Sequence, residues 1–582
     1  MEQNEMPGFI GIIGENLPAA FDIKTKSLGA RLERRRSRDD TWVKSLVVPK
    51  FLGDKLFEED QGMFICTDGV LLNAKALRSK LKSPNNFELL KEMYRNDGVT
   101  AIEALRGSFS GVIYDGHDDV WHVFTDHLGT KPVFYFRDEP RHCMIFASEL
   151  NMILSAMRQL GYRPKLCEVG AYCLLTFGFM LADYTYVQNV KRLTPGCVLT
   201  VRNDVANFTQ YYKLANTRFS GHSKEMMISE LDRRFRDAVR SEYEKDQEYN
   251  YGHISTLSGG LDSRMSVTYA RQLGYPDVLT MTISQAGYLD EQIAKTISAD
   301  YGYYFLFYSL NNGNYLKDLE RPLLANDGLV LFPGSAHVLA MQTLIDWQGL
   351  GMMHTGMAGD LIMGSYLSHP FHSPPGLDTI EKVAYSTKLI KGIPSDVLDT
   401  ITRSHENEEM FALYERCING VWNGFWTAQQ STEAISPFLY VDFMDYAMSI
   451  PPRYRYKERI YHDWIRKCAP EAAEYPWEKY AGMRIGTPRA IVFAKQAMRY
   501  GKRYMGSAAY SMNPFDYWYR TNEGLRKSFA SHFERDISYL QNYPKLKDDV
   551  AYLFQHGTLL EKGQCLTLLG AVRLFLSEEQ LN

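Results

Sequence analysis

The chain has 582 residues, with 65 Lys and Arg against 69 Asp and Glu, and so a formal net charge of −4. That length exceeds what one ordinary hydrophobic core organises, so the sequence predicts two domains. The near-neutral charge argues against a polyanionic partner, and we expect no nucleic-acid binding. No stretch reaches the roughly twenty apolar residues of a membrane span, and the polar, acidic start predicts no secretion signal. Eight cysteines without a CxxC pair indicate buried thiols in a reducing cytoplasm.

The first part of the chain alternates short strands with helical segments. An apolar strand is expected at 6–14, and further strands at 63–66, 110–114, 120–124 and 144–147. Helical periodicity covers 87–94 and 99–105. This order predicts an α+β sandwich up to about residue 205, within a first domain over 1–214.

A polar, mostly basic stretch at 216–224 is predicted to link this domain to a second one over 215–582. An amphipathic helix is expected at 225–244. A strand leading to residue 256, a helix at 265–273, a strand at 278–283 and a helix at 292–301 are expected to follow. Strand, helix and strand in this order predict a right-handed parallel crossover, the core of a doubly wound α/β sheet. Helical patterns over 491–582 predict a helical C-terminal extension, for which the sequence offers no function.

The turn between the first strand and helix of this crossover reads TLSGGLDSR over 256–264. Gly259 and Gly260 would let the backbone approach a phosphate, and the helix start adds N–H groups and a partial positive charge. The hydroxyl groups of Ser258 and Ser263 can donate to the same ligand. The lysine and spacing of a Walker A loop are absent. A serine- and glycine-rich turn without a ligand is the alternative interpretation.

Two aspartates at predicted strand ends indicate a metal. Asp262 would repel a bare phosphate, so its place in the loop predicts Mg²⁺ between the carboxylate and the phosphate. Asp360 follows a second apolar strand start at 350–353. Two carboxylates brought together from two strand ends repel each other unless a cation lies between them. If Asp262 and Asp360 lie together, as the resemblance described below implies, their repulsion is itself an argument for Mg²⁺ between them.

Several phrases then resemble one enzyme family. The loop is similar to the SGGxDS pyrophosphate loop of ATP pyrophosphatases, and residues 355–366 resemble the SGEGxDExFGGY segment of asparagine synthetases. In the first domain, residues 125–135 resemble the RDHLGxxPLYY phrase of that family's class II glutamine amidotransferase domain, and shorter matches lie at 146–150 and 190–196. The resemblance implies an Ntn-hydrolase-like sandwich followed by an ATP-pyrophosphatase domain.

The resemblance also implies the residues of the site. The implied ATP-binding residues are Leu257, Ser258, Gly259, Gly260, Leu261, Asp262, Ser263, Ile283 and Gly356, and the implied Mg²⁺ ligands are Asp262 and Asp360. Lys479 falls on the lysine that binds pyrophosphate, and Glu433 is a candidate base. The alternatives are a plain core isoleucine at Ile283 and a solvated lysine at Lys479, with Arg484 acting in its place.

An acidic pair at Asp290 and Glu291 opens the helix expected at 292–301. It resembles a DE pair that the family places near the nucleotide. Two acids at a helix start also simply suit the helix dipole, so both interpretations stay open.

Six positions depart from the family pattern, one of them Ile435, which replaces an arginine. Pro7 stands where glutamine-hydrolysing members carry their nucleophilic cysteine, Val70 replaces an acidic substrate anchor, and Asn86 replaces an aspartate. The sequence therefore predicts a first domain that makes no ammonia from glutamine. In the second domain Met357 and Leu361 replace two glutamates, the first of which helps the amine lose its proton. β-Lactam synthetases and lasso-peptide macrolactam synthetases also lack the cysteine and differ at this segment.

The chemistry that the resemblance implies is carboxylate activation with ATP and Mg²⁺. A small-molecule or peptide carboxylate would be adenylated, and ammonia or another amine would then form the amide, with AMP and pyrophosphate released. A nucleotide-binding pseudoenzyme or scaffold is the main alternative, and a glutamine-hydrolysing asparagine synthetase is a poorer one. The identity of the acid, the identity of the amine and the oligomeric state stay open, a homodimer included.

Overall fold

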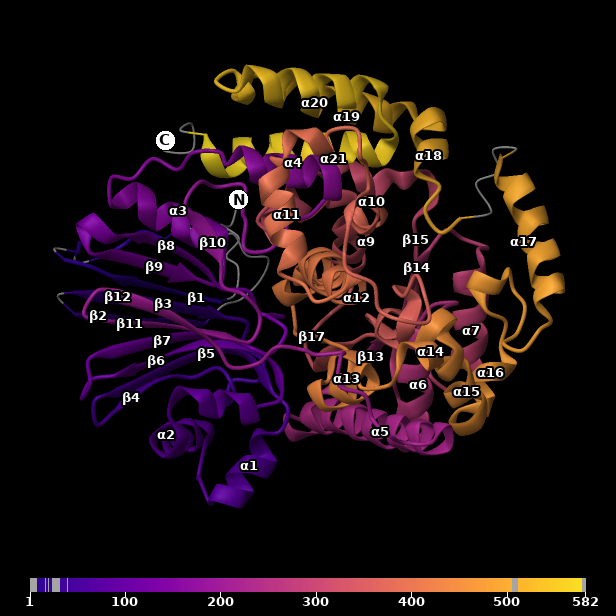
Figure 1. The fold of residues 1–582 in the computed structure, drawn as a ribbon, viewed down its shortest axis with the longest axis horizontal. Helices are drawn as coiled ribbons and strands as arrows, with labels where there is room; N and C mark the ends of the chain where they lie inside the picture. The colour runs from indigo at the N-terminus through magenta and orange to yellow at the C-terminus, as the bar shows by residue number, and fades with distance from the viewer. Residues whose placement is uncertain are drawn as a thin grey trace.

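The computed structural model describes residues 8–15, 17–18, 20–23, 32–38, 40–504 and 511–577. Pro7, the predicted replacement for the nucleophilic cysteine, lies outside the described residues. The N-terminal part contains two antiparallel sheets, and the C-terminal part contains one parallel sheet (Figure 1). The expected order of an α+β sandwich followed by an α/β unit is therefore present.

The two N-terminal sheets pack face to face. Their strand orders are β10-β8-β9-β1-β3-β2 and β12-β11-β7-β6-β5-β4, and every neighbouring pair is antiparallel. The strands are β1 (Gly8–Ile13), β2 (Leu32–Arg38), β3 (Thr41–Val47), β4 (Phe57–Asp60), β5 (Met63–Leu71), β6 (Gly107–Asp115), β7 (Val120–Thr125), β8 (Phe134–Asp138), β9 (Cys143–Ala147), β10 (Val190–Arg192), β11 (Cys197–Arg202) and β12 (Val205–Gln210). Phe9, Val43, Val112 and Trp121 belong to the core between the sheets.

Helices cover the outer faces of both sheets. Helices α3 (Leu150–Gln159) and α4 (Glu168–Phe177) lie on the first sheet's side, and α1 (Ala74–Leu81) and α2 (Asn86–Asp97) lie on the second's (Figure 1). Strand β5 is therefore buried along its whole length, which explains why it runs past the predicted end at Cys66. Its polar residues find partners inside: the Thr67 hydroxyl donates to the Asp54 carbonyl at 2.7 Å, and Asp68 pairs with Lys131 at 3.1 Å.

The C-terminal part is built on a parallel sheet in the order β15-β14-β13-β16-β17. These strands are β13 (Gly252–Thr256), β14 (Leu279–Ser284), β15 (Tyr304–Ser309), β16 (Leu350–His354) and β17 (Ala434–Ile435). The accompanying helices are α5 (Lys224–Glu248), α6 (Asp262–Gln272), α7 (Leu289–Tyr301), α8 (Glu320–Ala325), α9 (Phe332–Gln342), α10 (Leu377–Val383), α11 (Ser395–Arg403), α12 (Glu408–Phe411), α13 (Val441–Met448), α14 (Pro452–Arg455), α15 (Arg459–Cys468) and α16 (Pro470–Glu474). The predicted crossover is confirmed as β13, α6 and β14, with β13 and β14 parallel.

The C-terminal extension is helical where it is described. It contains α17 (Arg489–Tyr504), α18 (Phe515–Thr521), α19 (Glu523–Asp536), α20 (Pro544–His556) and α21 (Leu559–Ala571). Helices α19 to α21 lie across the top of both parts in Figure 1. The Tyr172 hydroxyl of α4 donates to Asp549 of α20 at 2.6 Å, and Gln564 of α21 donates to the Leu174 carbonyl at 3.2 Å. The extension therefore joins the N-terminal and C-terminal parts.

The predicted linker carries no helix or strand between residues 211 and 223, and α5 begins at Lys224 with Ser223 as its N-cap. Over the described ranges, no helix combines the length and the apolar character needed to cross a membrane.

Candidate active site

The loop predicted to bind phosphate joins β13 to α6, as expected. Its shape is set by internal hydrogen bonds: the Ser258 N–H donates to the Ser263 Oγ at 3.0 Å, and the Gly260 N–H donates to the Ser258 Oγ at 3.1 Å. The helix α6 begins at Asp262, three residues before the predicted start. The N–H groups in its first turn have no partners within the helix, so this turn can still receive an anion.

Two buried side chains anchor the loop from outside. Asp290, at the start of α7, accepts the Gly259 N–H at 2.7 Å, and burial raises the pKa of this carboxyl to about 6. Arg264 is fully buried and donates to the carbonyl groups of Gly259 at 3.2 Å and Ala472 at 2.9 Å. Of the predicted acidic pair, Asp290 therefore holds the loop. Glu291 instead accepts the Gly287 N–H at 2.6 Å.

Asp262 and Asp360 are brought together as predicted. The Asp360 N–H donates to the Asp262 Oδ2 at 3.0 Å, and the Tyr461 hydroxyl donates to the Asp262 Oδ1 at 2.8 Å. Burial and the charge of Asp360 raise the pKa of Asp262 well above its usual value. The pKa of Asp360 is raised as well, chiefly by burial and against the effect of Lys479. Two partly buried carboxylates with raised pKa values form a site that favours a cation.

Two glycines allow this close approach. A Cβ at Gly356 would lie 2.1 Å from the Ser263 nitrogen, and a Cβ at Gly359 would lie 2.5 Å from the Asp262 Cγ. Gly356 was expected to let the backbone close over the nucleotide. The structure gives it a different contact, because its open side is occupied by the first turn of α6. Sequence reasoning did not identify Gly359.

Lys479 lies at the same site. Its Nζ is 2.9 Å from the Glu458 Oε2. Burial lowers the pKa of Lys479, but the charges of Glu458, Asp360 and Asp262 outweigh burial and raise it. Lys479 is therefore a charged ammonium group that pairs with Glu458, and its side chain is 49% exposed, so it is also partly solvated. Sequence reasoning missed Glu458, whose only signal was its position inside the segment 453–479, which resembles the family's closing stretch.

The residues present fit a magnesium ion. Mg²⁺ prefers hard oxygen ligands, one or two of them from carboxylates, and takes the rest from water and phosphate. Asp262 and Asp360 offer such oxygens at the carboxyl ends of β13 and β16, where an open parallel sheet binds its ligands. Lys479 carries a single positive charge, so it balances only part of the negative charge of Asp262, Asp360 and Glu458.

Glu433 does not have the environment of a base. Its carboxylate pairs with Lys55 at 2.8 Å and with Lys131 at 2.7 Å, and all three side chains are buried. Burial would raise the pKa of Glu433, but the two lysines outweigh it and lower the pKa to about 2. A carboxylate held this strongly in its charged form is a weak proton acceptor. Glu433 instead joins the parallel sheet to the N-terminal part.

The remaining predicted residues lie in or around the loop. Leu257 and Leu261 are buried in the core. Ile283 is the residue before the last of β14; it is half-buried and packs against core residues, which leaves both of its interpretations open. Met357 is held at its backbone, where its carbonyl accepts the Ser436 hydroxyl at 2.8 Å.

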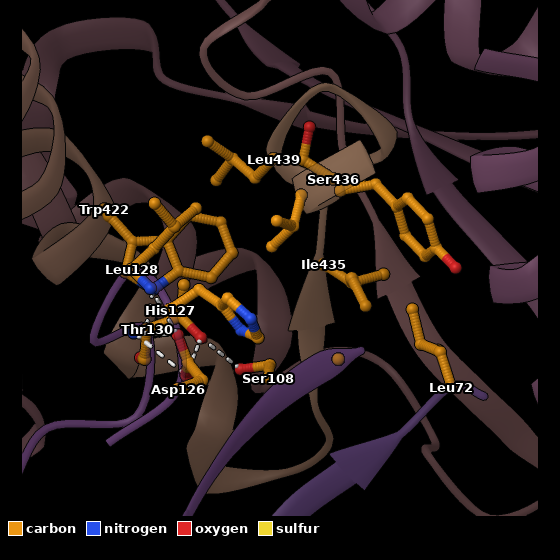
Figure 2. Close-up of a pocket in the computed structure, with 13 residues that line it drawn as sticks. Leu72, Ser108, Asp126, His127, Leu128, Thr130, Trp422, Ile435, Ser436 and Leu439 are labelled. Carbon is orange, nitrogen blue, oxygen red and sulfur yellow. Dashed lines mark hydrogen bonds between the residues drawn. The ribbon is translucent and has the colours of Figure 1, made fainter. Parts of the chain in front are cut away.

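A small cavity lies where the two parts meet (Figure 2). Its volume is about 20 Å³, enough for about one water molecule. Asp126 on its wall accepts the Thr130 hydroxyl at 2.6 Å, and Trp422 comes from the opposite part of the chain. Val70, at the position of the lost acidic anchor, lies close by in a cluster with Met352 and Ile435.

The cysteines show no activated thiol. The buried ones include Cys66, the first in the chain, and burial raises its pKa to about 12. A thiol with a raised pKa is a poor nucleophile at neutral pH.

Two family models match the chain. The model described as glutamine amidotransferase domain matches residues 52–212, and the model described as asparagine synthase matches residues 230–412. Asparagine synthetase [glutamine-hydrolyzing] 1 of Bacillus subtilis (strain 168) is 25% identical over 46% of this chain and 42% of its own length. A second B. subtilis asparagine synthetase is 22% identical over 56% of this chain and 46% of its own length. Asparagine synthetase B of Escherichia coli (strain K12) is 20% identical over 68% of this chain and 64% of its own length.

The chain thus spans less than two thirds of the length of each of these relatives. The two models and the relatives support the asparagine synthetase family for this chain.

Proposed function

We propose that this chain is an ATP-dependent carbon–nitrogen ligase of the asparagine synthetase type, which forms an amide and releases AMP and pyrophosphate. The observation that carries the proposal is the partly buried pair of Asp262 and Asp360 beside the loop after β13. The asparagine synthase match over 230–412 contains both aspartates.

In the first step a carboxylate oxygen of the substrate bonds to the α-phosphorus of ATP, and the bond from that phosphorus to the bridging oxygen breaks. Pyrophosphate leaves, and the acid becomes an acyl adenylate. In the second step an amine nitrogen bonds to the carbonyl carbon, AMP leaves, and the amine gives up a proton. The first step is needed because a free carboxylate is a poor electrophile.

In the first step, residues of the chain would stabilise the negative charge of the phosphates. The ammonium group of Lys479 would meet the negative charge that develops on the leaving pyrophosphate, which lowers the barrier more than it tightens ATP binding. Mg²⁺ held by Asp262 and Asp360 would supply further neutralisation of the phosphate charges. The first turn of α6 and the hydroxyl of Ser258 would position the phosphates.

The proton released in the second step needs an acceptor. Met357 cannot accept one, and Glu433 is held by two lysines. Glu458 is better placed: its Oε1 is buried without a hydrogen-bond partner among the described residues, and burial raises its pKa, so it binds a proton more readily than an exposed glutamate. We propose Glu458 as this base, in place of Glu433.

We also propose that the N-terminal part is an Ntn-hydrolase-like domain over 1–214 without glutaminase activity, followed by the synthetase domain over 215–582. Three observations support the loss of activity: proline at position 7, the ion pair of Asp68 with Lys131, and Val70 in an apolar cluster. Ammonia or another amine would then be taken directly as the nitrogen source.

The test is calorimetric titration of Mg²⁺·ATP into the wild type and Asp262→Asn. Asp277→Asn is the matched control, because Asp277 is exposed and has a positive φ of 54° that asparagine also accepts. We expect the wild type and the control to bind and Asp262→Asn to lose most of the affinity. A search for acids that trigger AMP release then separates a ligase from a scaffold, because a scaffold binds ATP without cleaving it at the α-phosphorus.

A further inference from the structure

A cavity of about 200 Å³ lies between the end of α4, the start of α9 and the helix η6 (Ala412–Trp422). Its apolar walls include Leu331, Val338 and Phe425. This volume is below the roughly 300–1,000 Å³ of pockets that bind drug-sized molecules, so it suits a small ligand. We call it the α9 cavity.

Two glycines in the lining of the α9 cavity have open space where a side chain would begin. A Cβ at Gly334 would meet no atom within 4 Å, and a Cβ at Gly424 would meet only the Gly334 carbonyl oxygen, at 3.8 Å. Gly334 lies inside helix α9, where glycine is less stable than alanine by roughly 0.5–1 kcal/mol. Gly334 is exposed and has no positive φ, so the backbone conformation does not require a glycine at this position.

Arg416 brings a positive charge to the wall of the α9 cavity. It donates to the Val383 carbonyl at 2.8 Å and lies 5.0 Å from the centre of the Tyr385 ring. Within the described ranges no carboxylate forms an ion pair with Arg416. A partly buried guanidinium group without a counter-ion favours binding of an anion, and its planar geometry matches a carboxylate. The same charge would repel the ammonium group of an amine substrate.

His337 lies on the same wall and adds no second charge. Burial lowers the pKa of His337 to about 4, and the Pro333 carbonyl offsets this only in part. Its imidazole is therefore neutral at physiological pH, so the α9 cavity holds one cation among mostly apolar side chains.

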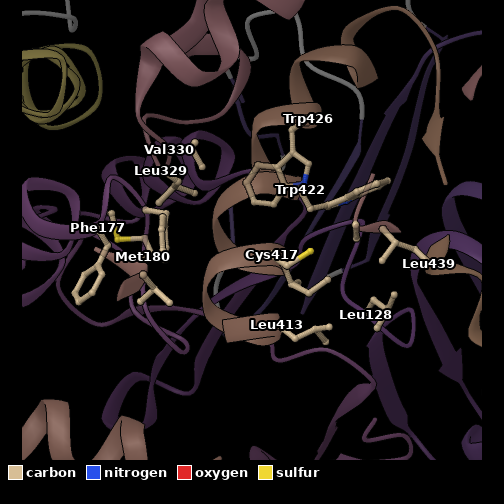
Figure 3. Close-up of a cluster of buried hydrophobic side chains, with 14 of the residues drawn as sticks. Leu128, Phe177, Met180, Leu329, Val330, Leu413, Cys417, Trp422, Trp426 and Leu439 are labelled. Carbon is tan, nitrogen blue, oxygen red and sulfur yellow. The ribbon is translucent and has the colours of Figure 1, made fainter. Parts of the chain in front are cut away.

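Arg416 of the α9 cavity and Asp360 of the proposed metal site both influence the pKa values of two side chains, Cys417 on η6 and Tyr366. Cys417 follows Arg416 on η6 and projects from this helix into the core (Figure 3). Burial raises the pKa of Cys417, the carboxylate of Asp360 raises it further, and Arg416 opposes both effects. The charges of Arg416 and Asp360 also act on the pKa of Tyr366, which Asp360 raises and Arg416 lowers. The charges of Arg416 and Asp360 therefore both act on Cys417 and Tyr366.

We propose that the α9 cavity binds the acid substrate, a small organic acid with an aliphatic or aromatic body. Its acidic group pairs with Arg416, and its apolar body lies against Leu331, Val338 and Phe425. This inference rests on the proposed ligase function for the identity of the ligand as a substrate, although binding of the acid can be measured without catalysis.

The test uses the full chain and two variants of the α9 cavity. Arg416→Gln removes the charge, and Gly334→Leu adds an apolar side chain to the lining, at a position where a Cβ meets no atom within 4 Å. Arg403→Gln is the matched control, because the Arg403 side chain is 84% exposed on α11. The probes are the straight-chain acids from butanoate to octanoate, benzoate, phenylacetate and 3-phenylpropanoate, with hexylamine and benzylamine as probes of opposite charge.

Binding is measured by saturation-transfer NMR and calorimetry. We expect at least one acid to bind to the wild type and the control, at least tenfold weaker binding to both cavity variants, and no amine binding. Mg²⁺·ATP affinity and thermal midpoints serve as checks that each variant folds, and Gly334→Leu keeps the test valid if Arg416→Gln does not fold. The inference is overturned if no acid binds to the wild type, or if both folded variants bind the acids as the wild type does.

A second readout separates this inference from the proposed function. If acids bind in an Arg416-dependent way but never trigger AMP release, the α9 cavity stands as an acid site and the ligase proposal is contradicted. If acids trigger AMP release equally in the wild type and both variants, the ligase proposal stands and the α9 cavity is not the acid site.

Discussion

The backbone N–H of Asp360 donates a hydrogen bond to the carboxylate of Asp262 at 3.0 Å, across 98 positions of the chain. This contact joins the turn after β16 to the first turn of α6. The two aspartates can lie this close because Gly356 and Gly359 present no side chain to α6. The metal site therefore depends on two small residues as much as on its carboxylates.

Gly356→Ala should disrupt the site without changing any charge. The new Cβ would lie 2.1 Å from a backbone nitrogen of α6, so the turn must move. We expect a loss of stability on the order of 1–3 kcal/mol, as for other overpacked sites, and a clear loss of Mg²⁺·ATP affinity by calorimetry. Gly334→Ala is the control, because its Cβ meets open space. Unchanged affinity in Gly356→Ala would show that the spacing of the two aspartates is not critical.

Lys479→Met should slow AMP formation while leaving ATP binding nearly intact. The lysine charge is needed most when pyrophosphate leaves, so its loss raises the barrier by roughly 3–4 kcal/mol, a rate loss of roughly a hundredfold to a thousandfold. ATP–pyrophosphate exchange measures the rate, and calorimetry measures the affinity. Lys467→Met, at an exposed position of α15, is the control. A variant that loses ATP affinity and rate equally would instead assign Lys479 to ground-state binding.

Glu433→Gln should mainly lower the stability of the folded chain. Removing this charge leaves Lys55 and Lys131 buried without their shared partner, although Lys131 keeps Asp68. Breaking a buried ion pair in this way costs on the order of 3–5 kcal/mol, so we expect a much lower thermal midpoint.

Glu381→Gln, on the exposed face of α10, is the control for that variant. A variant with a normal thermal midpoint but no amide formation would restore Glu433 as the catalytic base.

Much of the loop and metal site could be predicted from the sequence because its signals are local. The glycine turn between strand and helix fixes the loop, and parallel strands bring Asp262 and Asp360 to one edge of the sheet. Lys479 was predicted differently, through the resemblance of its segment to the family.

The partners of Glu433 could not be predicted in the same way. Lys55 and Lys131 are far from it in the sequence, and nothing in their neighbourhoods indicates a buried charge. Glu458 was missed for a related reason, because its raised pKa results from burial that only the folded chain creates. The α9 cavity likewise depends on how η6 packs against α4 and α9.

His354 gives a pH-dependent prediction away from the metal site. Its ring lies between the carboxylates of Asp246 at 2.8 Å and Glu242 at 3.1 Å, and Tyr243 stacks on it with ring centres 4.1 Å apart. Burial lowers its pKa, but the two acids outweigh burial and raise the pKa from 6.5 to about 9. His354 is therefore a buried cation at neutral pH.

Because the folded chain binds this proton more tightly than the unfolded chain, the stabilising effect is complete below pH 6.5 and is lost as the pH rises to about 9. A shift of this size corresponds to on the order of 3 kcal/mol. Glu242, whose pKa is raised by burial to about 7, changes stability in the same direction at lower pH. We therefore expect the thermal midpoint of the wild type to fall between pH 6.5 and 9.

His354→Gln should lower the midpoint at pH 6.5 and flatten this fall, since the titrating imidazole is gone. His117→Gln, at an exposed position, should follow the wild-type curve. Differential scanning calorimetry across this pH range makes the comparison. If the wild type and His354→Gln curves run parallel, His354 does not hold its proton, and the two neighbouring acids must share a proton between themselves instead.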